Sequence, residues 1–277
     1  MNPVAKALWY IESHLARDLS LDEIAAGAEV SRFHLTRAFG AATGRSPMRY
    51  ARGRRLTRAA QTLARGAPDI MAVALDAGYS SHEAFTRSFR DQFNCTPESV
   101  RDSRNLNRLS LVDPIRLEET VSPHLPPVRF EHCKTLLVAG ISRRYNCETS
   151  AGVPAQWNEF LPQFGHVPGQ VGRIAYGVRC NTDSEGAFDY VCGVEVPSFA
   201  PLSASLTRIR VPAQKYAVFS HTEHVAAIRS TWSTIWNEWL PKSGHEVVDA
   251  PDFERYGEEF DSRTGLGGFE IWLPIKG

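Results

Sequence analysis

Two segments of the sequence repeat each other: "WNEFLPQFGH" at 157–166 and "WNEWLPKSGH" at 236–245 are identical at seven of ten positions, 79 residues apart. The similarity extends outward, because "VRFEHCKTLLVAGISRR" (128–144) parallels "TRIRVPAQKYAVFSHTE" (207–223), and "FDYVCGVEV" (188–196) parallels "GFEIWLPI" (268–275). Each half is typical of a strand–helix–strand–strand unit. One such unit cannot close a core alone, so we predict that two pair about a pseudo-twofold axis into one α+β sheet with both helices on one face.

The repeated segment itself predicts the end of a helix. Its Trp and Leu can pack onto a sheet, its Pro ends the helix, and its Gly-His turns into the next strand. The two copies lead into different segments: the second leads to "DFERYGEEF", which contains Glu254, whereas the first leads to "RIAYGVRC", which has no acid at the matching place. We therefore expect the repeat to form a groove and the break in the repeat to give that groove its charge.

The front of the chain contains a second duplication. "IAAGAEVSRFHLTRAFGAATGRSP" (24–47) aligns with "VALDAGYSSHEAFTRSFRDQFNCTP" (73–97). Each unit has a helix of small residues, a tight turn and a second helix with Arg on one face and Phe two positions on. This pattern predicts two helix-turn-helix units in an all-α domain. In the first turn Glu29 stands where the second has Gly78, at a position that often needs a positive φ angle.

Charge is divided unevenly along the chain. Residues 1–110 contain 16 Lys and Arg against 11 Asp and Glu, a net charge of +5, and the remainder contains 15 against 20, a net of −5. Arginine supplies 15 of the 16 cations in the front part, which suits forked recognition of phosphates and guanine edges. The asymmetry points to a nucleic-acid partner for the front part.

Composition also sets the expected boundaries and compartment. A proline-bearing stretch without periodicity separates the helical pattern of the front from the strand-like pattern of the back. We therefore predict a front domain at 1–105, a linker at 106–126 and a back domain at 127–277. The five cysteines include no CxxC pair, which favours reduced thiols in a cytoplasmic protein. The beginning of the chain is not typical of a signal peptide, and no run of 18 apolar residues predicts a membrane span. The histidines are not spaced as a metal site, and we expect no metal and no cofactor.

The front domain resembles the DNA-binding domain of the AraC/XylS family of transcription regulators over roughly residues 4–105. Both helix-turn-helix units, the Arg-rich connecting segment "RYARGRRLTRAAQTLA" (49–64) and the closing "FNCTPESVR" match in order. The resemblance implies that the second helix of each unit enters the major groove, so that one chain reaches two successive grooves about 34 Å apart. RNA polymerase is a further partner that it implies.

The same resemblance assigns DNA-contacting residues to the second helix of each unit. In "SRFHLTRAF", Arg37 matches the base-reading arginine, and Phe33 and Thr36 match positions that offer apolar and hydroxyl contacts, while Arg32 is expected near phosphate. In "SSHEAFTRSF", the corresponding residues are His82, Thr86 and Arg87.

The back domain, over about residues 125–277, resembles the GyrI-like small-molecule-binding domain. The segments "QKYAVFSH", "IWNEWLPKSGHEV", "APDFERYGEEF" and "FEIWLPI" carry this resemblance. It implies a groove lined by aromatic rings around an acid that attracts lipophilic cations, and the matching acid is Glu254. A carboxylate among rings is poorly solvated and so favours a counter-cation. The candidate rings are Tyr145, Trp157, Tyr176, Trp232, Trp236, Phe253, Tyr256, Phe269 and Trp272.

Three functions remain open at this point. The first is a DNA-binding transcription regulator that is not an enzyme and senses a small, lipophilic or cationic effector through its back domain. The second is a GyrI-like hydrolase with Glu254 as general base, although the sequence has no GxSxG motif and no Ser-His-Asp ordering. The third is a constitutive regulator whose back domain is a protein-interaction module without a ligand.

Overall fold

The computed structural model of the chain describes residues 2–115, 125–200 and 202–277. It forms two compact units, one of Met1–Leu35 and Arg45–Glu118 and the other of Thr36–Gly44 and Glu119–Gly277. Part of the expected linker, residues 116–124, lies outside the described residues. Across the described ranges, no helix is both long and apolar enough to cross a bilayer.

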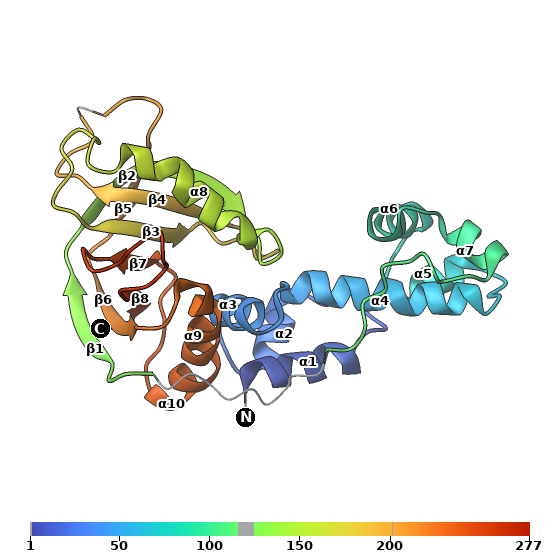
Figure 1. The fold of residues 1–277 in the computed structure, drawn as a ribbon. Helices are drawn as coiled ribbons and strands as arrows, with labels where there is room; N and C mark the ends of the chain where they lie inside the picture. Colours follow the sequence, from blue (N-terminus) through green and yellow to red (C-terminus); the bar gives the residue numbers. More distant parts are fainter. Residues whose placement is uncertain (1, 116–124, 201) are drawn as a thin grey trace. The chain divides into compact units, whose positions relative to one another are not determined.

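The front of the chain is entirely helical, as predicted. Its helices are α1 (Pro3–Ser13), α2 (Leu21–Gly27), α3 (Arg32–Thr43), α4 (Pro47–Ala64), α5 (Ile70–Asp76), α6 (His82–Phe93) and α7 (Pro97–Ser103). The pairs α2–α3 and α5–α6 are the two helix-turn-helix units, and α4 joins them (Figure 1). Local signals fix several helix starts: Ser20 and Glu23 form a capping box at α2, and Pro47 and Pro97 occupy the first turns of α4 and α7.

Both helix-turn-helix turns use the left-handed backbone conformation. Glu29 has a φ of 59° and Gly78 a φ of 79°, so the two turns correspond at the position where the sequences differ. A side chain is strained in this region, whereas glycine is not. Glu29 ion-pairs with Lys6 of α1, which offsets part of that strain.

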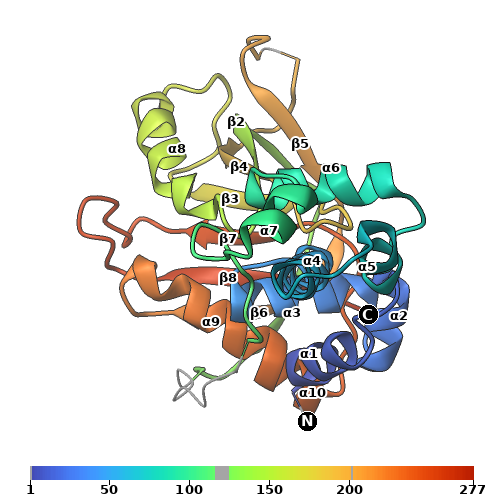
Figure 2. The same ribbon diagram turned by 90° about the vertical axis from the view of Figure 1, so that its right-hand side faces the viewer.

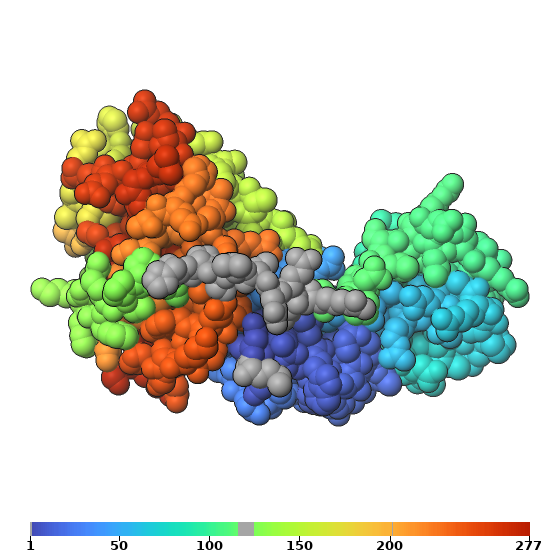
Figure 3. Space-filling view, turned by 60° about the horizontal axis from the view of Figure 1, so that its bottom comes forward, coloured from blue at the N-terminus to red at the C-terminus, as the bar shows by residue number. Residues whose placement is uncertain are grey.

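Helix α4 is held along its length by the segment that follows α7. Arg54 donates to Glu12 through Nε at 2.8 Å and to the carbonyl oxygen of Val112 through Nη1 at 2.7 Å, and the Val112 amide donates to the Thr57 hydroxyl at 2.9 Å. Gly53 makes room for Val112, because a Cβ on Gly53 would lie 2.8 Å from Val112 Cγ2. The segment from α5 to α7 packs as one lobe on the far end of α4 (Figure 3, cyan to green).

The second unit is built on one eight-stranded sheet whose neighbouring strands are all antiparallel, in the order β1-β6-β8-β7-β3-β4-β2-β5. The strands are β1 (Arg129–Cys133), β2 (Leu136–Tyr145), β3 (Ala175–Cys180), β4 (Phe188–Glu195), β5 (Thr207–Val211), β6 (Gln214–His221), β7 (Asp252–Tyr256) and β8 (Phe269–Ile275). The order is symmetric about the β7–β3 pair, which is the pseudo-twofold arrangement that the duplication predicts.

Each half contains one strand more than the sequence pattern indicated. The stretch predicted as a single strand before each helix divides into two, β1 and β2 in the first half and β5 and β6 in the second. In the second half the division falls at Pro212, which has no amide hydrogen to donate to a ladder. The extra strands are exchanged between the halves, because β1 pairs with β6 and β5 pairs with β2.

The helices α8 (Val153–Phe160) and α9 (Ile228–Thr234) lie on the same side of the sheet (Figure 2). Side chains from alternate strand positions, including Tyr190, Cys192 and Val194, form the core beneath α8. The intervening positions, such as Val191 and Val178, pack into a second core on the opposite face. After α9 the chain continues as a π-helix (Ile235–Trp239) and the short α10 (Leu240–Ser243).

Candidate functional site

A large cavity lies between α8, α9 and the middle strands of the sheet. Its volume is about 1210 Å³, which is enough to enclose a drug-sized molecule. Trp157 and Phe160 of α8 line it on one side, Trp232 and Trp236 line it on the other, and Glu254 of β7 lies in the sheet beneath. The two copies of the repeated segment therefore contribute their first tryptophans, Trp157 and Trp236, to the same cavity.

Glu254 is the centre of a hydrogen-bonded chain inside this cavity. Its Oε2 accepts from the Tyr190 hydroxyl at 2.5 Å and from the Tyr256 hydroxyl at 3.2 Å, and Trp157 Nε1 donates to the Tyr190 oxygen at 3.2 Å. All of these donors are neutral. Within the described chain, the other oxygen, Oε1, has no hydrogen-bond partner, so the carboxyl group keeps one acceptor available to a ligand.

Burial dominates the electrostatics of Glu254. Loss of hydration raises the pKa of this carboxyl group, while the hydrogen bond from Tyr190 opposes the rise and the charge of Asp252 adds to it. The pKa values of the Tyr190 and Tyr256 hydroxyl groups are raised well above their ordinary range, mainly by burial and then by Glu254, so both remain proton donors. A cation that enters the cavity stabilises ionised Glu254 and is stabilised by it.

Gly177 of β3 makes the Glu254 arrangement sterically possible. It lies directly opposite Glu254 in the β3–β7 ladder. A Cβ at this position would lie 2.1 Å from the Tyr190 hydroxyl oxygen and 2.6 Å from Glu254 Oε2. The absence of a side chain on β3 is therefore what allows Tyr190 and Glu254 to meet.

Asp252 and Arg179 form a second charged pair two residues along the same two strands. They are cross-strand partners, with Arg179 Nε 3.7 Å from Asp252 Oδ1. The Arg179 guanidinium carbon lies 4.8 Å from the Phe188 ring centre and 5.7 Å from the Trp232 ring centre. Burial raises the pKa of Asp252, and Arg179 opposes that rise. The sheet thus presents both an acid and a guanidinium group to the cavity.

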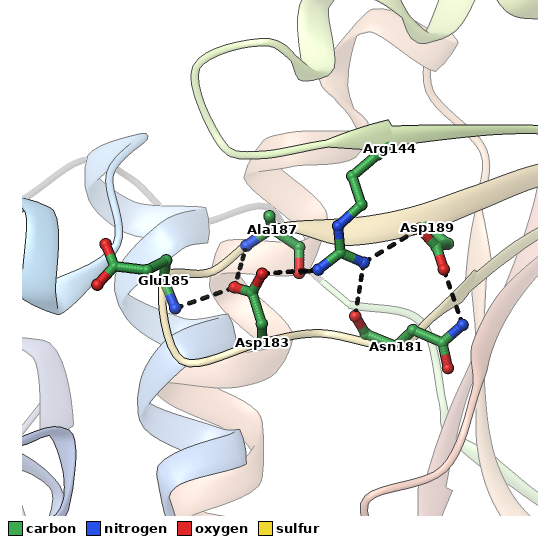
Figure 4. A network of polar contacts seen from close by, with 6 residues as sticks. All are labelled: Arg144, Asn181, Asp183, Glu185, Ala187 and Asp189. Atoms are coloured by element: carbon green, nitrogen blue, oxygen red, sulfur yellow. Dashed lines mark hydrogen bonds and ion pairs between the residues drawn. The ribbon is translucent and has the colours of Figure 1, made fainter.

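The β3–β4 hairpin is fixed by a network around Arg144 of β2 (Figure 4). Arg144 donates to Asp189 at 3.0 Å and to Asp183 at 2.6 Å, as well as to the carbonyl oxygens of Asn181 and Ala187 at 2.9 and 3.2 Å. Asp183 in turn accepts from the amide of Ala187 at 2.9 Å, which closes the loop. The network positions the β3–β4 hairpin, which carries Arg179 on β3 and Phe188 on β4.

The structure brings together four of the predicted rings, Trp157, Trp232, Trp236 and Tyr256, with Glu254 around the cavity. It places the remaining five elsewhere. Tyr176, Phe253 and Trp272 belong to the core on the opposite face of the sheet, because each lies one residue away from a cavity-facing position. Phe269 packs behind Tyr256 at 4.7 Å between ring centres, and the Tyr145 hydroxyl bonds the carbonyl oxygen of Gly152.

The residues predicted to contact DNA differ in exposure. On α6, His82 and Arg87 are exposed and Thr86 is half-buried. On α3, Arg32 is exposed and pairs with Asp22 at 3.2 Å, and Phe33 is half-buried. Thr36 and Arg37 are buried, and both are part of the second unit.

Arg37 occupies an electrostatic environment quite unlike that of Arg87. Its Nη2 lies 2.6 Å from Asp252 Oδ2, and its side chain is 2% exposed. An arginine reads guanine by placing its fork in the major groove. Arg37 can therefore contribute to DNA reading only when Asp252 does not hold it.

Several cavity residues are absent from the sequence-based prediction. Tyr190, Arg179, Phe188 and Gly177 come from β3 and β4, from which the prediction named only Tyr176. The alternation in "FDYVCGVEV" places Phe188 and Tyr190 on one face, so period-two analysis could have found these two. Nothing in the local sequence indicates that Arg179 and Gly177 lie opposite Asp252 and Glu254, because that register depends on the pairing of distant strands.

Comparison with known proteins finds relatives that span nearly the whole chain. The curated Transcriptional regulator Rob of Salmonella typhimurium is 27% identical over 97% of this chain and 96% of its own length. The Right origin-binding protein of Escherichia coli K12 is 28% identical over the same shares. A solved structure of SAV2435 bound to tetraphenylphosphonium aligns with 55% of this chain and 95% of that chain, with a TM-score of 0.47 and 19% identity.

Two family descriptions cover most of the chain. Residues 14–103 match a helix-turn-helix domain, which corresponds to the span from α2 through α7. Residues 126–276 match the GyrI-like small molecule binding domain, which corresponds to the eight-stranded sheet and the helices on it. With more than half of its length in that match and a helix-turn-helix domain ahead of it, the chain belongs to the GyrI-like small-molecule-binding family.

Proposed function

We propose that this protein is a transcription regulator that binds DNA through its two helix-turn-helix units and binds an amphipathic cation in the cavity of its second unit. The observation that carries the ligand part is Glu254: a buried carboxyl group with neutral hydrogen-bond donors, one available oxygen and aromatic walls. Such a group gains more from a counter-cation than an exposed carboxylate does, and the rings add cation–π attraction.

The DNA part of the proposal is supported by the two helix-turn-helix units and by the names of the relatives, which are transcriptional regulators. We propose that α3 and α6 enter two successive major grooves and that RNA polymerase is the protein partner. Arg87 is exposed on α6 and makes no ion pair with any residue that the structure describes, which suits a base or phosphate contact.

We also propose that the protein binds its ligand without converting it. A general base must be free to take a proton from its substrate. Tyr190 and Tyr256 already donate to Glu254 and hold it as an acceptor among rings, an arrangement that suits retention of a cation. Chromatographic analysis of ligand after prolonged incubation tests this point; products formed by the wild type and lost in Glu254→Gln would favour the hydrolase.

The ligand part is tested with rhodamine 123, an aromatic cation whose binding is followed by fluorescence anisotropy. At 100 times its Kd such a ligand should stabilise the second unit by about 2.7 kcal/mol. Glu254→Gln keeps the shape of the side chain and removes its charge, so it should weaken binding by at least about tenfold. Glu131→Gln makes the same change on exposed β1 and serves as the control. Equal binding by both variants contradicts the proposal.

The DNA part is tested with a binding site that the protein selects from a random DNA pool. Arg87→Ala should cost about 1–3 kcal/mol of binding to the selected site and relax its sequence preference. Arg37, the corresponding arginine of α3, is held by Asp252 and can read DNA only when that ion pair opens, so Arg37→Ala is expected to cost no more than Arg87→Ala. Arg101→Ala, on α7 beside Asp102, is the control for the loss of one positive charge. Unchanged gel-shift titrations for Arg87→Ala would show that α6 does not read DNA.

A further inference from the structure

We infer that Arg179 forms an anion-binding subsite beside Glu254, so that the ligand of this cavity is a zwitterion: an aromatic cation that also carries a carboxylate or similar acidic group. The inference rests on the proposed function, because it assumes that the positive end of the ligand lies at Glu254. It adds a second, oppositely charged recognition point in the same cavity.

Within the described residues, the Arg179 guanidinium group keeps hydrogen-bond donors unused. Its Cζ lies 4.8 Å from the Phe188 ring centre and 5.7 Å from the Trp232 ring centre, and its Nε approaches Asp252 Oδ1 at 3.7 Å. Its Nη1 and Nη2 have no hydrogen-bond partner within the described ranges of the chain, although Arg179 lines the cavity and its side chain is only 22% exposed. A guanidinium group that lies close to two rings and has both Nη atoms unused presents the forked donor pair that a carboxylate accepts.

The charge around Asp252 also favours an anion beside Arg179. The single carboxylate faces two guanidinium groups, because its Oδ2 lies 2.6 Å from Arg37 Nη2 while its Oδ1 faces Arg179. Asp252 therefore holds Arg179 in position without neutralising it fully. An anionic group of a ligand can neutralise the remaining positive charge of the two guanidinium groups without displacing Asp252.

The spacing of Glu254 and Arg179 suits one ligand that reaches both. Gly177 pairs with Glu254 and Arg179 pairs with Asp252, two residues along the same strands and on the same face. Two residues of strand span about 7 Å. A rigid aromatic molecule can bridge this distance while its rings contact Trp157 on one wall and Trp232 on the other.

Rhodamine 110 and its methyl ester, rhodamine 123, form a matched pair of probes for this inference. They share the aromatic cation and differ only in whether the pendent carboxyl group is free or esterified. The full-length wild type should bind the free acid at least about tenfold more tightly than the ester, as expected for a charge-assisted hydrogen bond. Arg179→Gln should remove that difference, and Arg179→Lys, which keeps the charge but loses the fork, should retain part of it.

Two further variants separate ligand recognition from a purely structural role of Arg179. Arg210→Gln removes one exposed arginine from edge strand β5 and should preserve the preference for the acid. Arg179→Met also removes the guanidinium group, leaves Asp252 with Arg37 as its ion-pair partner, and should lose the preference for the acid. If Arg179→Met keeps the preference for the acid, or if Arg179→Gln weakens both probes equally, the inference is overturned.

The outcomes also separate this inference from the proposed function. Binding of the ester that is lost in Glu254→Gln, together with no preference for the acid in the wild type, overturns the anion subsite alone. Failure of the wild type to bind either probe overturns both. A preference for the acid that depends on Arg179 supports both.

Discussion

The substitution Gly177→Ala tests the geometry of the cavity most directly. The added methyl group would lie 2.1 Å from the Tyr190 hydroxyl oxygen and 2.6 Å from Glu254 Oε2, both far inside van der Waals contact. Tyr190 and Glu254 are 4% and 8% exposed, so neither side chain can move freely into solvent. The backbone itself tolerates alanine, because Gly177 is not among the residues with positive φ.

The expected cost follows from this overlap. Overpacking of a well-ordered core by one methyl group destabilises by about 1–3 kcal/mol. For a unit of this size each kcal/mol lowers the Tm by about 2–4 °C, so the transition of the second unit should fall by about 2–12 °C. Because Glu254 must shift, rhodamine 123 should bind at least about tenfold more weakly.

Differential scanning calorimetry and anisotropy titration measure the two effects. Gly257→Ala is the control, since a Cβ there meets nothing within 4 Å. The second variant Gly177→Ala/Tyr190→Phe removes the oxygen that overlaps most, so the double change should be less damaging than the sum of the single changes by about 0.5–3 kcal/mol. A Gly177→Ala protein with the Tm and affinity of the wild type would refute the reasoning, as would strict additivity of the two changes.

Three further outcomes are expected. Burial raises the pKa of Glu254 above 4.5, so the contribution of this group to the stability of the unliganded unit is lost as the pH rises through the raised pKa, whereas the affinity for rhodamine 123 should increase over the same pH range. Stability and affinity measured between about pH 4 and about pH 8 should therefore change in opposite directions, and Glu254→Gln should flatten both pH profiles. Glu29→Gly relieves a left-handed side chain and should stabilise the first unit by up to about 1 kcal/mol in urea unfolding; clear destabilisation would contradict the strain. Arg54→Met removes the guanidinium group that ion-pairs with Glu12 and leaves that carboxylate with the Tyr50 hydroxyl, so it should cost about 2–4 kcal/mol, less than a fully buried pair because Glu12 is 29% exposed. Exposed Arg65→Met, at the end of α4, should cost little in the same assay.

Local sequence signals predicted the helical front of the chain well because its elements are defined by near neighbours. The capping box at Ser20, the prolines that open α4 and α7, and the correspondence of Glu29 with Gly78 all involve residues a few positions apart or a repeat of such patterns. The sequence pattern did not predict that each long strand divides into two. At that point the apolar character continues across the break, and only the exchange of strands between the halves reveals it.

The sequence predicted the part of the candidate site that the repeat makes visible. Glu254 was identifiable because an acid interrupts one copy of a repeat, and Trp157 and Trp236 because they occupy the same place in both copies. Tyr176 and Trp272 were included because the sequence shows that a residue is aromatic but not which face of the sheet it lies on. That face depends on the alternation of side chains along the strand and on which elements cover each side of the sheet.

The sequence by itself therefore determined the two-part architecture, the duplicated units within each part, the acid of the cavity and the aromatic helices beside it. These are properties of periodicity, capping and repetition, which short-range interactions enforce. Only the tertiary structure decided that Gly177 lies opposite Glu254, that Tyr190 donates to it, and that Arg179 stands beside it with its outer edge unused. Those relations join residues between 64 and 77 positions apart in the chain, and their register is set by the collective pairing of the whole sheet rather than by any local pattern.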